Sequence, residues 1–224
     1  MKLYKTDKNI IKFSPKAAQF LNGLASNEIT KPQSAFLTVH GKIIATFDQL
    51  KVSDDEVWAV IESPFVEDIL NHLSRYLTLS GVKAEILAIS VYFDLAGDYS
   101  LKSDESAISQ KAGKLVLTSH DLPSGVSEEE FTLFRLKNKI PLHGVDYKDD
   151  LLLNVSTTDH VSFTKGCYLG QEPISKVYNR SKPSWRLVVK PESDCSEEEK
   201  SKMTSKAADP ESRKTIGFVF ERNA

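Results

Sequence analysis

A loop rich in chemically useful side chains runs from Phe163 to Pro173, with the sequence F-T-K-G-C-Y-L-G-Q-E-P. Cys167 is one of only two cysteines in the chain, and it stands between two glycines with Lys165 before it and Glu172 after it. A neighbouring ammonium group and a helix N-terminus both favour the thiolate form of cysteine. Cys167 could therefore be a nucleophile, a transient metal ligand or a redox-sensitive thiol, and the alternative is a small hydrophobic side chain that fills the core.

The elements that would position this loop are a strand, a tight turn and a helix. The preceding residues alternate apolar side chains like a strand, Gly166 and Gly170 permit a sharp turn, and Pro173 suits the first turn of a helix. This order would place Cys167 and Gln171 at the top of a sheet, beside free backbone N–H groups. Such a position suits an anionic or amide-rich ligand.

The N-terminal part of the chain alternates strand and helix patterns. These patterns predict, in order, a short helix begun by Ser14 and Pro15, two strands within residues 35–47, a strand at 57–61, an amphipathic helix at 63–77 and strand character at 82–93. This is the order of a split β-α-β unit, in which helices cover one face of an antiparallel sheet.

Part of this order recurs further along the chain. Residues 114–118 predict a strand, and Ser127 and Glu130 have the spacing of a capping box at the start of a helix. Charged and small residues dominate Pro191 to Lys214, so we expect a mobile, protease-sensitive insertion there, followed by a last strand at residues 216–220.

Composition limits the class of protein. The 224 residues are 40% hydrophobic and 27% charged, with 29 basic and 31 acidic side chains and a net charge of −2. This predicts a globular protein without the basic field that stable nucleic-acid binding requires. We expect a cytoplasmic location with reduced thiols and no membrane span, because no apolar run is long enough to cross a bilayer.

Other motifs of catalysis and metal binding do not occur in the sequence. The two cysteines have no zinc-ligand spacing, and the glycines form neither a dinucleotide fingerprint nor a P-loop, so we expect no structural zinc and no nucleotide. We expect surface or core roles for the scattered histidines, which are His40, His72, His120, His143 and His160.

The run K-G-C-Y-L-G-Q-E, Lys165 to Glu172, resembles at all eight positions the signature of the YgfZ family, folate-binding relatives of the glycine-cleavage aminomethyltransferase. Weaker agreement covers about the first 190 residues and carries over Asn27, Arg135 and Pro141 by position. The resemblance implies a tetrahydrofolate-binding fold of ferredoxin-like units with a small β-barrel. It also implies a role in maturing or repairing iron–sulfur enzymes, including one that thiomethylates tRNA.

From this resemblance we expect an α+β protein with ferredoxin-like (split β-α-β) units at residues 1–90 and 91–180. Residues 181–224 would be a reduced, truncated remnant of the barrel with a charged loop at 191–214. Tetrahydrofolate or a derivative would bind between the two units near the signature loop, and the partners would be iron–sulfur client or assembly proteins.

The resemblance also implies a set of site residues. Cys167 would be the functional thiol, and the folate-binding residues would be Lys165, Asn27, Arg135, Asn154, Tyr168, Gln171 and Glu172. Lys165 and Arg135 suit the anionic glutamate tail of the ligand, whereas Asn27, Asn154 or Glu172 suits its ring.

Departures from the pattern leave two alternatives open. Transferases carry an acidic pair where this chain has Ala45 and Thr46, and neither side chain can accept a proton as a carboxylate does, so one-carbon transfer is the less favoured alternative. Lys176 stands where the family usually has an arginine, and the chain lacks most of the barrel. These departures are compatible with a scaffold of the same fold that binds no ligand.

Overall fold

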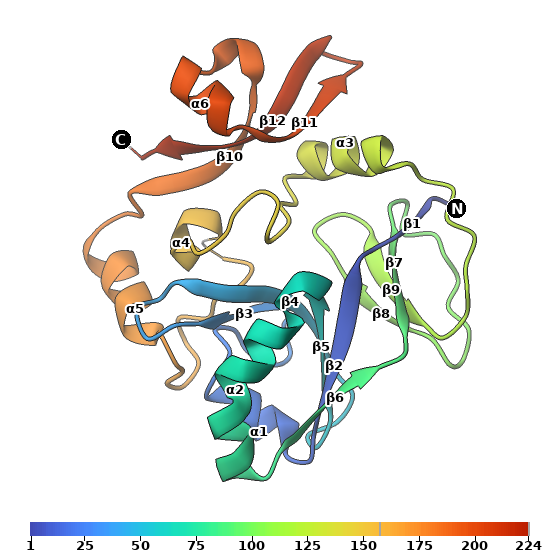
Figure 1. Ribbon diagram of the computed structural model, residues 1–224, viewed down its shortest axis with the longest axis vertical. Coiled ribbons are helices and arrows are strands. Elements are labelled where there is room, and N and C mark those ends of the chain that lie inside the picture. Colours follow the sequence, from blue (N-terminus) through green and yellow to red (C-terminus); the bar gives the residue numbers. More distant parts are fainter. Residues whose placement is uncertain (157, 224) are drawn as a thin grey trace.

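The computed structural model describes residues 1–156 and 158–223. Three antiparallel sheets organise the chain, and helices cover them (Figure 1). The larger two sheets lie side by side in the lower part of the view, and the smallest lies above them with α3 between. The mixture of helices and antiparallel strands agrees with the α+β expectation at this level.

The first sheet has five strands in the order β3-β4-β5-β2-β6. Its strands are β2 (Lys8–Ser14), β3 (Gln33–Leu37), β4 (Ile43–Lys51), β5 (Val57–Glu62) and β6 (Lys83–Leu87). Helix α1 (Ala17–Asn22), the short η1 (Ser63–Phe65) and α2 (Val66–Ser80) pack on one face. The predicted strands and the long helix are confirmed, but Ser14 is not a cap, because α1 begins after Lys16 and has no side-chain cap.

Helix α2 shows how local sequence sets these elements. Glu67 and Asp68 stand in its first turn, where carboxylates complement the helix dipole, and Gly81 ends it with φ = 74°, a conformation that glycine adopts without strain. Ile69 and Leu73 are fully buried against the sheet. Helical spacing of these two residues is the signal that predicted the element.

The second sheet has four strands in the order β1-β7-β9-β8. They are β1 (Leu3–Lys5), β7 (Ser90–Asp94), β8 (Ser106–Ser109) and β9 (Lys114–Thr118), and α3 (Glu128–Asn138) packs on them through Phe131. The predicted strand at 82–93 is therefore two strands in different sheets. Strand β1 pairs with β7, so the N-terminus crosses the expected boundary at residue 90.

Residues 191–214 are not the loop that we expected. The chain from β10 (Trp185–Pro191) continues through η2 (Glu192–Asp194), α6 (Glu197–Lys202) and β11 (Thr204–Asp209) to β12 (Lys214–Arg222), in a sheet ordered β10-β12-β11. Cys195 and Met203 are buried against Val219. A Cβ on Gly217 would lie 2.5 Å from Met203 Cγ, so glycine makes room for this small core.

The signature region packs on the first sheet. Helices α4 (Leu152–Val155) and α5 (Gln171–Arg180) form a core with Leu37 and Ile43 on the face of β3 and β4 opposite α2. Residues 158–170 are turns and bends, so the strand predicted before the signature is wrong. The alternating apolar side chains Val161 and Phe163 pack into this core and do not belong to a paired strand.

Candidate ligand-binding cleft and signature loop

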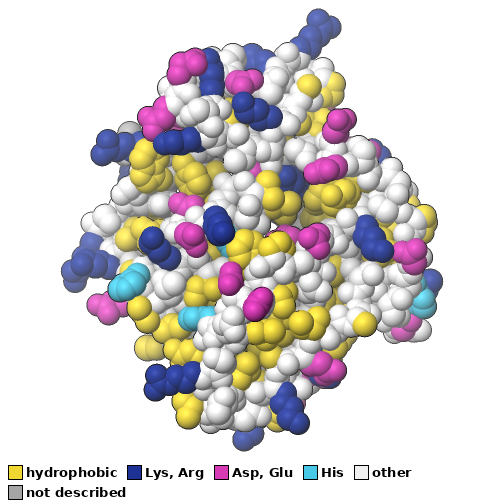
Figure 2. Space-filling view, viewed as in Figure 1, with side chains coloured by type: hydrophobic (Ala, Val, Ile, Leu, Met, Phe, Trp, Pro, Cys, Tyr) yellow, Lys and Arg dark blue, Asp and Glu magenta, His cyan; other side chains and the backbone are white. Residues whose placement is uncertain are grey.

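A cleft of about 860 Å³ lies between the two large sheets. Strands β2, β4 and β5 supply one wall, and the β8–β9 turn and α3 supply the other. Most of the segment from Lys139 to Lys148 also lines the cleft, together with Asp159, His160 and, in β11, Ser205 and Lys206. Figure 2 shows charged side chains of both signs around the middle of this face, with hydrophobic side chains between them.

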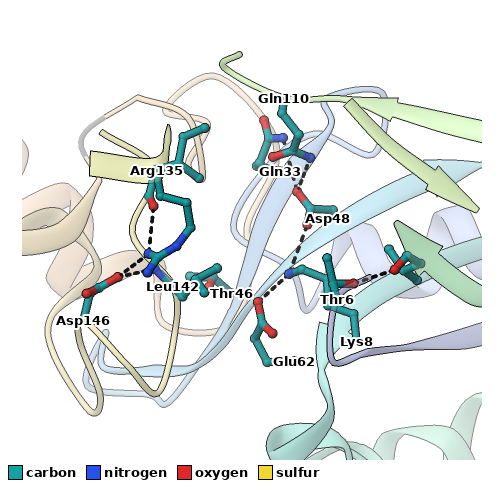
Figure 3. A network of polar contacts seen from close by, with 12 residues as sticks. Thr6, Lys8, Gln33, Thr46, Asp48, Glu62, Gln110, Arg135, Leu142 and Asp146 are labelled. Carbon is teal, nitrogen blue, oxygen red and sulfur yellow. Dashed lines mark hydrogen bonds and ion pairs between the residues drawn. The ribbon is translucent and has the colours of Figure 1, made fainter. Parts of the chain in front are cut away.

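A buried cluster of charges holds the wall formed by the first sheet. Lys8 Nζ lies 2.6 Å from Glu62 Oε1 and 3.5 Å from Asp48 Oδ2. Asp48 Oδ1 also accepts hydrogen bonds from the side-chain amides of Gln33 (3.3 Å) and Gln110 (2.8 Å), and Gln110 comes from the other sheet (Figure 3). Burial opposes the charge of Lys8, but the two carboxylates outweigh it and raise the pKa of Lys8.

A second buried ion pair lies apart from the cluster around Lys8. Arg135 Nη1 donates to Asp146 Oδ2 at 2.8 Å, and the side chains are 3% and 0% exposed (Figure 3). Asp146 also accepts hydrogen bonds from the backbone N–H of Leu142 and from the hydroxyl groups of Thr204 and Ser205. This carboxylate therefore joins α3, the segment after it and β11.

Position 46 lies in the wall of the cleft, but it carries no carboxylate. The Thr46 hydroxyl lies 2.6 Å from the Tyr147 hydroxyl, and both side chains are buried. Ala45, the preceding residue, points into the core beneath α2. The cleft thus has a hydroxyl pair at the place where sequence comparison put the acidic pair of transferases.

Buried polar atoms without hydrogen-bond partners concentrate around this cleft. In the described part of the chain, six buried side-chain atoms lack a partner, and four of them belong to residues that line the cleft. The four are Arg135 Nε, His160 Nδ1 and both ring nitrogens of His143. Buried polar atoms are normally paired, so this concentration sets the lining of the cleft apart from the rest of the described core.

The signature loop lies outside the cleft and presses against the β3–β4 hairpin. A Cβ on Gly170, which has φ = 83°, would lie 2.5 Å from the carbonyl oxygen of Thr38. Lys165 Nζ donates to the backbone carbonyl groups of Ala25 (2.7 Å) and Asn27 (2.9 Å). Burial lowers the pKa of Lys165 to about 8. Lys165 therefore anchors the loop, and it does not point toward the cleft.

The two cysteines have opposite environments. Cys167 is exposed at the tip of the loop, whereas Cys195 is buried and its thiol donates to the carbonyl group of Pro191 at 3.4 Å. Burial, followed by the charge of Glu199, raises the pKa of Cys195. The charged residues around Cys195 predict that it is the more exposed of the two thiols, but η2 and α6 fold over it and bury it.

The structure separates the predicted site residues. Of that set, Arg135 lines the cleft, but its guanidinium group is already paired with Asp146. Asn27 is buried, and its side-chain amide donates to the carbonyl groups of Gln33 and Asp159. The others lie outside the cleft: Lys165, Cys167 and Tyr168 in the signature loop, Asn154 in α4, and Gln171 and Glu172 in α5. A direct folate contact for these residues stays a prediction.

Sequence reasoning missed the residues that build the cleft. Lys8, Asp48 and Glu62 belong to different strands, and no spacing along the chain announces that they meet. We had assigned His143 an ordinary surface or core role. Among the described residues, no cluster of metal-ligating side chains and no helix long and apolar enough to cross a membrane occurs.

Comparison with known proteins places this geometry in a known fold. The crystal structure of glycine cleavage system aminomethyltransferase T from Bartonella henselae superposes with a TM-score of 0.76 at 13% identity, covering 99% of this chain and 78% of that one. The chain therefore has the fold of that aminomethyltransferase.

The sequence comparisons are less specific. An uncharacterized protein of Haemophilus influenzae is 24% identical over 183 residues, which is 73% of this chain and 63% of that protein. The chain thus spans less than two thirds of the length of this relative. No family model matches the chain, so its membership of the YgfZ family stays a prediction.

Proposed function

We propose that this protein binds tetrahydrofolate or a derivative in the cleft between the two large sheets and supports the maturation or repair of iron–sulfur proteins through Cys167. One observation carries the binding part of the proposal. Four buried polar atoms without partners belong to residues around one cleft of about 860 Å³, a size that suits a drug-sized cofactor.

The lining fits both ends of a folate. A pterin ring offers adjacent donors and acceptors, which match the unpartnered nitrogens of His143 and His160. The glutamate tail is anionic, and exposed lysines line the cleft: Lys111, Lys139 and Lys148. Their positive charge replaces the contribution that we had expected from Lys165 and Arg135, whose side chains bind other parts of the protein.

Cys167 would act toward a partner protein rather than on the folate. Its side chain is exposed, and it does not line the cleft. A thiol in that position can reach an iron–sulfur client or assembly protein that docks on the loop, while the cleft holds its ligand.

One-carbon transfer is not the activity that we propose. An aminomethyltransferase of this fold would need an ionised carboxylate, and the chain places Thr46, bonded to Tyr147, in the wall of the cleft. Asp48 lies two residues further along β4, but its oxygens already bind Lys8, Gln33 and Gln110. A methylene-transfer assay with the full chain should therefore give no turnover.

Calorimetric titration with tetrahydrofolate tests the placement. Ser109 is an exposed residue of the cleft lining, so Ser109→Trp should block entry and abolish measurable binding. Ser103→Trp is the matched control, because Ser103 is equally exposed on the same chain segment and does not line the cleft. If the unmodified chain binds no folate, the scaffold alternative is correct. If both variants bind normally, the ligand lies elsewhere.

A further inference from the structure

His143 occupies an unusual position in the wall of the cleft. It is only 4% exposed, yet neither ring nitrogen has a hydrogen-bond partner. Its ring is stacked on Phe65, with centroids 3.7 Å apart, and it lies 5.2 Å from the ring of Tyr147. Phe65 covers one face of the imidazole, and the polar edge is the part of His143 left without a partner.

The chemistry of that edge is restrictive. A neutral imidazole donates from one nitrogen and accepts at the other, so a partner satisfies both only if it offers an acceptor and a donor. Burial lowers the pKa of His143 to about 4; the charge of Asp149 opposes this shift, and those of Lys8 and Lys148 reinforce it. The ring is therefore neutral near pH 7.

We propose that His143 selects the heterocyclic ring of the ligand, through hydrogen bonds to an amide-like or aminopyrimidine-like edge. This inference rests on the proposed folate site and assigns the ring end of the ligand to His143. A carboxylate offers acceptors alone, so the glutamate tail cannot satisfy both nitrogens. The lysines that line the cleft would bind the tail. One of them is Lys148, which follows His143 by five residues along the chain.

The test uses His143→Phe, which keeps an aromatic ring against Phe65 and removes both ring nitrogens. The affinity of the full chain for tetrahydrofolate should fall about tenfold, the equivalent of one to two hydrogen bonds. The affinity for 4-aminobenzoylglutamate, which carries the tail without the pterin, should not change. The thermal midpoint without ligand should stay level or rise, since two unsatisfied buried atoms disappear.

Two internal controls keep the outcome unambiguous. His72→Phe alters a half-buried histidine of α2 that does not line the cleft, and it should leave both affinities unchanged. In the spectrum of the imidazole nitrogens, the signals of His143 should move on addition of tetrahydrofolate, and those of His72 and His120 should not.

Each alternative result has a distinct meaning. If the chain binds tetrahydrofolate and His143→Phe binds it equally well, His143 is a water-bonded structural residue and the inference is wrong, while the proposed function stands. Equal weakening of tetrahydrofolate and the tail fragment would also overturn it, because the substitution would then have disturbed the whole cleft. If the unmodified chain binds no folate, the proposed function and this inference fall together.

Discussion

The cleft and the signature loop are built by different physical means. Buried charges that neutralise one another hold the cleft, as Lys8 with Glu62 and Arg135 with Asp146 show. The loop is held instead by backbone carbonyl groups that bind Lys165 and by the close approach of Gly170 to the β3–β4 hairpin, and its thiol is exposed. The proposed ligand site and the exposed thiol are therefore separable by mutation.

A short polar segment connects the two regions. His160 lines the cleft, and its carbonyl group accepts a hydrogen bond of 2.5 Å from the hydroxyl of Ser26. Asn27 follows Ser26 in the chain, and its side-chain amide donates to the carbonyl group of Asp159. The backbone carbonyl group of Asn27 accepts a hydrogen bond from Lys165 Nζ. The stretch from Asp159 to Lys165 thus contacts the cleft at one end and holds the signature loop at the other.

The largest expected effect comes from Cys167→Ser. This change removes the exposed thiol with little change of volume, so complementation of an iron–sulfur maturation defect should be abolished. Folate affinity and the thermal midpoint should remain as in the unmodified chain, because the side chain lines no part of the cleft and no core. Measurement of client activity in cells together with calorimetry checks both halves. A parallel loss of folate affinity would break the distinction between the two regions.

Alkylation rates sharpen the same comparison. Cys195 is a poor reference because burial alone slows its reaction. Asn71→Cys places an exposed thiol in the middle of α2 and is the better one. Near neutral pH, we expect Cys167 to react with iodoacetamide faster than this reference thiol. Equal rates would show that accessibility alone accounts for the reactivity of Cys167.

Arg135→Met should cause the largest loss of stability. It leaves the Asp146 carboxylate buried without its charged partner, which typically costs about 3–5 kcal/mol of the free energy of unfolding. Arg186→Met is the control, because that arginine pairs with Glu221 at the surface and contributes at most about 1 kcal/mol. Denaturant unfolding measures both. A small loss for Arg135→Met, with weaker folate binding, would restore the ligand role that the sequence suggested.

Acid should lower the stability of the folded chain through His143. The unfolded chain binds a proton on His143 near its ordinary pKa of 6.5, but the folded chain does so only near 4. The unfolded state thus holds more protons in this window, so the free energy of unfolding should fall by about 3 kcal/mol from pH 6.5 to 4 through this residue. His143→Phe should show a correspondingly smaller fall. An unchanged pH dependence would mean that His143 titrates normally.

Lys165→Met should cause a smaller loss of stability than Arg135→Met. The carbonyl groups of Ala25 and Asn27 lose their donor, which costs about 1–2 kcal/mol. Folate affinity should change by less than about twofold, because the ammonium group does not line the cleft. A strong loss of affinity with little loss of stability would return Lys165 to the ligand and contradict the anchoring role.

Strong local signals in the sequence predicted much of the fold. The Ser-Pro start and helical spacing gave the helix that ends at Gly81, and the apolar run at residues 57–61 gave β5. Ser127 does accept a hydrogen bond from the backbone of Glu130, as the capping box predicts. The reciprocal bond is missing because the Glu130 carboxylate pairs with Lys2.

The sequence-based predictions that are wrong share one physical cause, because tertiary contacts determine the structure at those positions. Residues 191–214 carry few apolar side chains, but Cys195 and Met203 are enough to bury against β12. The capping box of Ser196 and Glu199 could have predicted α6. Nothing in the spacing of His143 predicted an unpartnered buried ring, because that property depends on Phe65, almost eighty residues earlier in the chain.

The connections between the two large sheets have a mechanical consequence. The chain passes from one sheet to the other through two residues between β1 and β2 and through two more between β6 and β7. These crossings lie side by side, since the backbone and hydroxyl of Thr6 both donate to the carbonyl group of Val91. Thr6 and Asp7 also line the cleft. The two sheets are therefore tethered at two adjacent points, and the core that Ile10 and Val60 form with Val91 and Phe93 fixes their separation beside the cleft.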